Sequence, residues 1–158
     1  MDSYRNAFSM VELIFVIVII GILAAVAVPK LSATRDDAKV STLISHAKNT
    51  LDDFQSFYTS QSNNRWTSAS VTEATDVPLE KTGCGGLVDT STALSPATFE
   101  LCNNGVTCLT FTTIDEGNLT IANGAVNTDP ICEAVKSDPA IAALSNKTYI
   151  LGGIAVNR

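Results

Sequence analysis

Residues 8–28 read Phe-Ser-Met-Val-Glu-Leu-Ile-Phe-Val-Ile-Val-Ile-Ile-Gly-Ile-Leu-Ala-Ala-Val-Ala-Val, an apolar run with one charged residue, Glu12, followed by Pro29. At a rise of about 1.5 Å per residue, a helix of roughly 20 apolar residues spans the ~30 Å hydrocarbon core of a bilayer. The run therefore predicts a membrane-length helix rather than a helix buried in a soluble core.

Glu12 is the anomaly in this run. A carboxylate costs about 2.5 to 3.5 kcal/mol at the centre of a membrane helix, so it needs a partner or a route to the interface. Two interpretations stay open: Glu12 reaches the headgroups, or it meets a cation. The candidate cations upstream are Arg5 and the chain's first amine. We favour a third cation, the amine that cleavage between Ala7 and Phe8 would create, because on a neighbouring copy it would lie at the same membrane depth.

The segment from Ala7 to Pro29 resembles the N-terminal signature of type IV pilins and pseudopilins. The family pattern is a short polar leader, a small residue, Phe-Thr-Leu-Ile-Glu-Leu, and an apolar helix interrupted by Gly and Pro. Residues 7–13 here read Ala-Phe-Ser-Met-Val-Glu-Leu, with Ala7 where the family usually has Gly. The resemblance implies that prepilin peptidase cuts after Ala7, that Phe8 becomes the N-methylated first residue, and that Glu12 docks on a neighbour's amine.

An ordinary secretory signal peptide is the main alternative for this segment. Ala25-Val26-Ala27 is a small-x-small triplet of the kind that signal peptidase cuts. The apolar run is too long for a signal peptide, however, and Glu12 interrupts it. An uncut signal anchor leaves Glu12 unexplained. More basic residues follow the run than precede it, where Arg5 is the basic residue, so the positive-inside rule does not fix the orientation. The resemblance alone puts the leader in the cytoplasm.

The helical pattern continues beyond Pro29. Apolar residues recur at steps of three and four from Val40 to Tyr58, which gives one apolar stripe. One helix is therefore predicted from about Phe8 to Thr59, apolar all round in its front half and amphipathic in its rear half. Gly21 and Pro29 match the positions at which the family's helix loosens or kinks, and a proline removes one helical hydrogen bond.

The remaining chain predicts a small antiparallel sheet. Residues 60–97 are polar and read as loops. The run 108–114 is rich in β-branched and aromatic residues and alternates, as a strand does. A turn is expected at 115–118 and a return strand at 119–122, so the pattern indicates a hairpin. A further strand is expected at Tyr149–Val156. Two short helical turns are expected at Pro130–Val135 and Pro139–Leu144, each opened by a proline.

These elements predict an α+β fold in which three or four strands cover the amphipathic half of the long helix, as the pilin resemblance also implies. We divide the chain into a leader at 1–7, a transmembrane or filament-core helix at 8–29, and a periplasmic or extracellular pilin-like domain at 30–158. The last of these includes the amphipathic half of the helix. It has room for one modest core.

Four cysteines, Cys84, Cys102, Cys108 and Cys132, lie in the part expected to be exported, where disulfides form and staple small domains. Three pairings are possible. We favour Cys84 with Cys102 and Cys108 with Cys132, because these close two medium loops, although a short Cys102–Cys108 ring across a hairpin stays open. The single histidine, His46, is far away in sequence, which argues against a zinc site.

Other ligand and modification signals are weak. The net charge of −6 and pI near 4.6 argue against general nucleic-acid binding. No nucleophile–base pattern appears, so we expect no enzyme activity and no cofactor, and the scattered acids define no calcium ligands. Asn118 begins an Asn-Leu-Thr sequon and is a candidate glycosylation acceptor, although a turn also favours asparagine there.

We therefore interpret the chain as the structural subunit of a type IV pilus or pilus-like filament. Its expected partners are prepilin peptidase, an inner-membrane assembly platform, membrane lipid, and copies of itself or other pilins and pseudopilins. Before assembly it would span the inner membrane once; afterwards it would lie in a periplasmic filament or a surface pilus. A type II secretion pseudopilin is the near alternative. A signal-anchored periplasmic binding domain is the alternative of another class.

Overall fold

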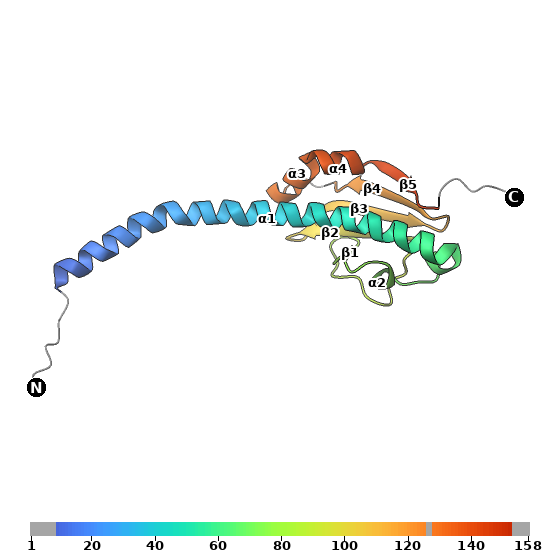
Figure 1. The fold of residues 1–158 in the computed structure, drawn as a ribbon, viewed down its shortest axis with the longest axis horizontal. Helices are drawn as coiled ribbons and strands as arrows, with labels where there is room; N and C mark the ends of the chain where they lie inside the picture. The colour runs from blue at the N-terminus through green and yellow to red at the C-terminus, as the bar shows by residue number, and fades with distance from the viewer. Residues whose placement is uncertain (1–8, 126–127, 153–158) are drawn as a thin grey trace, which may run out of the picture. The chain divides into compact units, whose positions relative to one another are not determined.

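A computed structural model describes residues 9–125 and 128–152 of the chain. Two compact units are distinguished, Met1–Ala38 and Lys39–Arg158. The elements, shown in Figure 1, are α1 (Met10–Trp66), α2 (Val71–Ala74), β1 (Glu80–Lys81), β2 (Ala97–Asn103), β3 (Val106–Ile114), β4 (Asn118–Asn123), α3 (Pro130–Ser137), α4 (Pro139–Leu144) and β5 (Lys147–Ile150). The α+β prediction, a long N-terminal helix with a small antiparallel sheet, is confirmed.

Helix α1 extends further than the sequence predicted. Its backbone leaves helical dihedrals at Ser62 (φ 65°), and a last helical segment then runs to Trp66. This extension buries Trp66 completely, and its indole N–H donates a hydrogen bond to the Ile114 carbonyl at 2.9 Å. Within residues 10–66 only Ser62 has non-helical dihedrals, so α1 stays helical through Gly21 and Pro29. Their role as bending points in a filament stays a prediction.

The sheet has five antiparallel strands in the order β1-β2-β3-β4-β5. The predicted β3–β4 hairpin is confirmed, as are the two proline-initiated helices, now α3 and α4. Three expectations were wrong. Residues 60–97 contain α2 and β1 as well as loops, the strand β2 was missed, and β5 begins at Lys147 and ends at Ile150, before a turn at 151–152. Residues 153–156 of the expected last strand lie outside the described residues.

The core lies between the sheet and the rear part of α1. Phe54 of α1 is fully buried, and its ring packs edge-on against Phe99 of β2 at 6.1 Å and Trp66 at 5.9 Å. Register aligns Phe99 with Phe111 and Phe111 with Ile121, so one face of three neighbouring strands points into the same core. The apolar stripe on α1 is what brings the helix onto this face: Leu43, Ala47, Leu51 and Phe54 are all buried.

Tyr58 fixes the end of the sheet to α1. Its ring lies edge-on to Trp66, with centroids 5.5 Å apart. It also lies against two glycines, Gly117 in the β3–β4 turn and Gly152 after β5, and a Cβ at either position would meet the ring. The Leu151 N–H donates to the Gly117 carbonyl at 2.9 Å, so these two glycine-containing segments are joined beside the ring.

Replacing Gly117 with alanine is therefore expected to destabilise the domain. Gly117 has φ +71°, which costs an alanine roughly 1 to 2 kcal/mol, and overlap with Tyr58 adds about 1 to 3 kcal/mol. Gly83→Ala is the matched control, because Gly83 has φ +75° but open space at its Cβ position. Thermal unfolding of both variants checks this. If Gly117→Ala lowered the melting temperature no more than Gly83→Ala, the contact with Tyr58 would not constrain this turn.

Candidate functional site

The front part of α1 exposes an unusually apolar surface. Every residue from Ser9 to Lys39 is exposed in the structure, including Ile22 at 64% and Leu23 at 63%. By length and composition, α1 is the one helix among the described residues able to cross a membrane. Soluble monomers rarely expose contiguous apolar patches of this extent, so lipid or other helices must cover this surface.

Glu12 lies at the start of α1 and takes part in a reciprocal capping arrangement. The Glu12 N–H donates to the Ser9 hydroxyl at 3.2 Å, and the Ser9 N–H donates to Glu12 Oε2 at 3.2 Å. Each residue thus satisfies a backbone donor that the first turn of a helix leaves unpaired. The sequence signal is Ser-x-x-Glu at residues 9–12, which was overlooked when Glu12 was considered only as a membrane carboxylate.

The capping bond leaves Glu12 able to accept further donors. A carboxylate has about four lone-pair positions on two oxygens, and among the described residues Ser9 is the donor found on Oε2. Glu12 is also the only acidic residue between Phe8 and Arg35. An amine from a second molecule can therefore bind this carboxylate without displacing Ser9. The expected cleavage residues, Ala7 and Phe8, lie outside the described residues.

Two disulfides staple the sheet, Cys84–Cys102 and Cys108–Cys132. This is the pairing that the loop lengths favoured. Ligand atoms of Glu80, Cys84 and Cys102 lie within 4.8 Å of one another, but both sulfurs are bound to each other, so they offer no thiolate to a metal.

A buried carboxylate that sequence analysis missed holds the loop carrying Cys84. Glu100 on β2 is 6% exposed, and its Oε2 accepts from the Gly83 N–H at 2.9 Å and the Cys84 N–H at 3.0 Å. The Thr107 hydroxyl donates to the same oxygen at 2.8 Å. These bonds compensate the cost of burying the charge and fix the loop beside the first disulfide.

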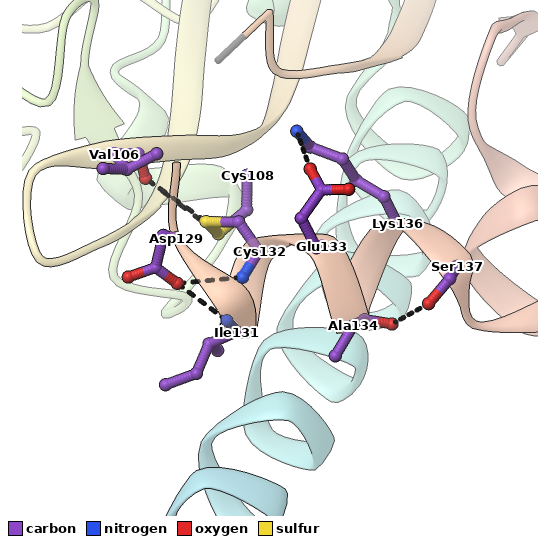
Figure 2. Close-up of polar contacts among 9 residues, drawn as sticks. All are labelled: Val106, Cys108, Asp129, Ile131, Cys132, Glu133, Ala134, Lys136 and Ser137. Atoms are coloured by element: carbon purple, nitrogen blue, oxygen red, sulfur yellow. Dashed lines mark hydrogen bonds and ion pairs between the residues drawn. A yellow bond between two sulfur atoms is a disulfide. The ribbon is translucent and has the colours of Figure 1, made fainter. Parts of the chain in front are cut away.

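Asp129 performs the same task beside the second disulfide. Figure 2 shows its carboxylate at the start of α3, where Oδ1 accepts from the Ile131 N–H at 2.9 Å and the Cys132 N–H at 3.0 Å. The Asn103 amide donates to both oxygens, at 3.1 and 3.0 Å. Asp129-Pro130 is a typical helix start, with aspartate at the N-cap and proline at the first helical position.

Other candidate sites are modest. Three surface clefts of about 130 to 210 Å³ all border Asp76, and they are smaller than the roughly 300 to 1,000 Å³ of ordinary small-molecule pockets. Asn118 is the half-buried first residue of β4 rather than part of the turn, and the hydroxyl of Thr120 in its sequon lies 2.9 Å from that of Thr148. Its glycosylation stays a prediction.

Comparison with known proteins identifies the N-terminal segment. Residues 2–28 match the family model of the prokaryotic N-terminal methylation motif, the signature of type IV pilins and pseudopilins. No curated protein and no solved structure matches the chain. This motif supports a type IV pilin-like or pseudopilin-like precursor, and the apolar helix and the pilin-like α+β architecture fit such a precursor. Proteins with this motif are structural rather than enzymatic, are processed by prepilin peptidase, and are anchored in the membrane before assembly into filaments.

The Asp129 cap predicts a stability loss in acid. Desolvation raises the pKa of Asp129, but hydrogen bonds from the Cys132 and Ile131 backbones and from Asn103 and Asn104 outweigh it, so the pKa is lowered. The carboxylate therefore stabilises the fold above the ordinary aspartate pKa of about 3.9, and this contribution is lost as pH falls through the lowered value.

Asp129→Asn is the matched test, because asparagine also caps helices but does not titrate. Urea unfolding midpoints at neutral pH and in acid would be compared for both proteins. We expect wild type to lose more stability than Asp129→Asn between the two conditions. Equal losses would show that the charge of Asp129 contributes nothing to the acid sensitivity.

Proposed function

We propose that this chain is the structural subunit of a type IV pilus or pilus-like filament. The observation that carries the proposal is the exposed apolar front part of α1, most of which lies within the methylation motif, with Glu12 at its start. Cleavage after Ala7 would free the amine of Phe8, which is then methylated. The apolar helices of successive copies would pack together as they leave the membrane.

Burial supplies the driving force for this packing. Apolar surface removed from water gains about 25 cal/mol per Å², and α1 exposes large apolar residues from Met10 to Leu31. The interface would be heterologous, because the front of one helix meets a different part of the next. Contacts of this kind that do not close into a ring generate open helical arrays, which is the geometry of a filament.

Glu12 would set the register between copies. In the membrane its charge is costly, by about 2.5 to 3.5 kcal/mol at the centre, and the amine of Phe8 on a neighbour would offset that cost. The Ser9 N–H already orients one carboxylate oxygen, so the group is held at the helix start before a neighbour arrives. Only copies displaced by the right amount would bring amine and carboxylate together.

Processing tests the proposal directly. Intact-mass and N-terminal peptide analysis of the protein from its native envelope should find a chain that starts at methylated Phe8. Mechanical shearing of the cells should release it if the filament reaches the surface. Processed protein that shearing leaves behind would favour a short secretion pseudopilus. A chain that retains Met1 or begins near Val28 would contradict the proposal and favour an anchored or secreted domain.

Substitutions at Ser9 and Glu12 separate capping from assembly. Glutamine at position 12 keeps a capping box but carries no charge, so Glu12→Gln should be inserted and processed normally yet form no filaments. Ser9→Ala removes a capping hydroxyl, worth about 0.5 to 2 kcal/mol of helix stability, but keeps the charge, so filaments should persist. Electron microscopy of both strains, with immunoblots for processing, gives the readout. Normal filaments from Glu12→Gln would eliminate the charge pairing.

A further inference from the structure

The chain contains two Asn-Gly dipeptides, Asn104–Gly105 and Asn123–Gly124, and the fold places them in different environments. Asn-Gly is the dipeptide most prone to spontaneous deamidation, because glycine has no side chain to hinder attack by its backbone nitrogen on the asparagine side chain. The reaction needs the backbone to rotate out of its folded conformation. Freedom at the dipeptide therefore decides whether it proceeds in the folded protein.

Asn104 and Gly105 form the two-residue turn of the β2–β3 hairpin. Both have positive φ, 50° and 75°, as a type I′ turn requires. Both are exposed, and a Cβ on Gly105 would meet no atom within 4 Å. Among the described residues, the Gly105 N–H has no hydrogen-bond acceptor. The attacking nitrogen is thus unbonded, and the space beside Gly105 is open.

Asn123 and Gly124 are held by their neighbours. Asn123 ends β4, in register with Leu109 of β3, and its Oδ1 is buried. The Gly124 N–H donates to the Cys108 carbonyl at 2.9 Å. A Cβ on Gly124 would overlap the Thr107 carbonyl, so this backbone lies tightly against β3. Attack by the Gly124 nitrogen would first require the strand end to detach.

We propose that Asn104 is a site of spontaneous deamidation and that the fold protects Asn123. The Gly105 nitrogen bonds to Cγ of Asn104, and the side-chain nitrogen leaves as ammonia with the proton that Gly105 gives up. Water then opens the resulting succinimide at either carbonyl. This hydrolysis breaks one C–N bond of the ring: opening at the side-chain carbonyl gives aspartate, and opening at the main-chain carbonyl gives isoaspartate. No oxidant or cofactor takes part.

The new carboxylate would form beside a charge that the fold depends on. Asn104 Nδ2 donates to Asp129 Oδ2 at 3.5 Å, and Asp129 caps α3 next to the second disulfide. Deamidation replaces this donor with a negative charge. Isoaspartate also lengthens the backbone of the two-residue turn by one atom. Both effects weaken the attachment of the hairpin tip to the start of α3.

Peptide mapping of the full chain in detergent micelles tests the site assignment. The protein would be incubated at mildly alkaline pH, and the peptides containing each Asn-Gly pair would be followed by mass spectrometry. We expect Asn104 to deamidate at least about ten-fold faster than Asn123, a ratio that corresponds to about 1.4 kcal/mol more protection at Asn123. In the reduced, denatured chain the two rates should converge. Similar rates in the folded protein, or a faster Asn123, would overturn the proposal.

Two variants test the consequence for Asp129. Asn104→Gly keeps a turn residue suited to positive φ and cannot deamidate, whereas Asn104→Asp places the product charge directly. At neutral pH the aspartate variant should have a lower melting temperature than the glycine variant. The difference should shrink in acid, where both carboxylates become protonated. An aspartate variant as stable as the glycine variant at neutral pH would refute the coupling to Asp129.

Discussion

The fold of the second unit depends on how the apolar stripe of α1 meets the sheet, and Phe54 is the centre of that contact. Its ring is fully buried between Phe99 and Trp66. Fully burying a side chain of this size contributes about 1.5 to 3 kcal/mol. The same packing requires α1 to continue past Ser62, because Trp66 reaches the core only from the last helical segment. The Trp66 bond to Ile114 then joins that segment to β3.

The front part of α1 is not buried in the core of the second unit. Large apolar residues from Met10 to Leu31 are exposed. The first residues of α1 that pack into the core of the second unit are the half-buried Val40, the buried Leu43 and the half-buried Ile44. A single helix is therefore satisfied by its own domain over one part and requires an external apolar environment over the other. This division matches a subunit that is membrane-bound before assembly, and in the proposed filament neighbouring helices take the place of lipid.

The rest of the domain uses one local device twice. Each disulfide has a carboxylate beside it that accepts two successive backbone N–H groups, one of them from a cysteine: Glu100 at Cys84 and Asp129 at Cys132. The cysteine separations are 18 and 24 residues, so each disulfide removes roughly 3 kcal/mol of loop entropy from the unfolded chain in the entropic account. The carboxylates act instead on the folded state, since they fix the segments that the disulfides join.

Sequence reasoning succeeded where a pattern is local. Periodicity located α1, the alternation at 108–114 located β3, and prolines located α3 and α4. Strand β2 also had a local signal, since Asn104–Gly105 between two alternating runs is a strong hairpin pattern, and it was overlooked. Glu100 had no local signal, because its two backbone donors come from a loop 16 and 17 residues away. A two-residue strand such as β1 is likewise specified by its neighbour rather than by its own sequence.

Ser9 and Glu12 show how one local pattern can serve both a monomer and an assembly. The capping box is a property of an isolated helix, and it forms here without any neighbour. It also restricts the Glu12 side chain, so less rotamer entropy remains to be lost when an amine binds. In the proposed filament the pairing then gains from a carboxylate already oriented by its own helix. In that proposal Ser9 contributes to assembly only by orienting the carboxylate, whereas the charge that would select a neighbour belongs to Glu12.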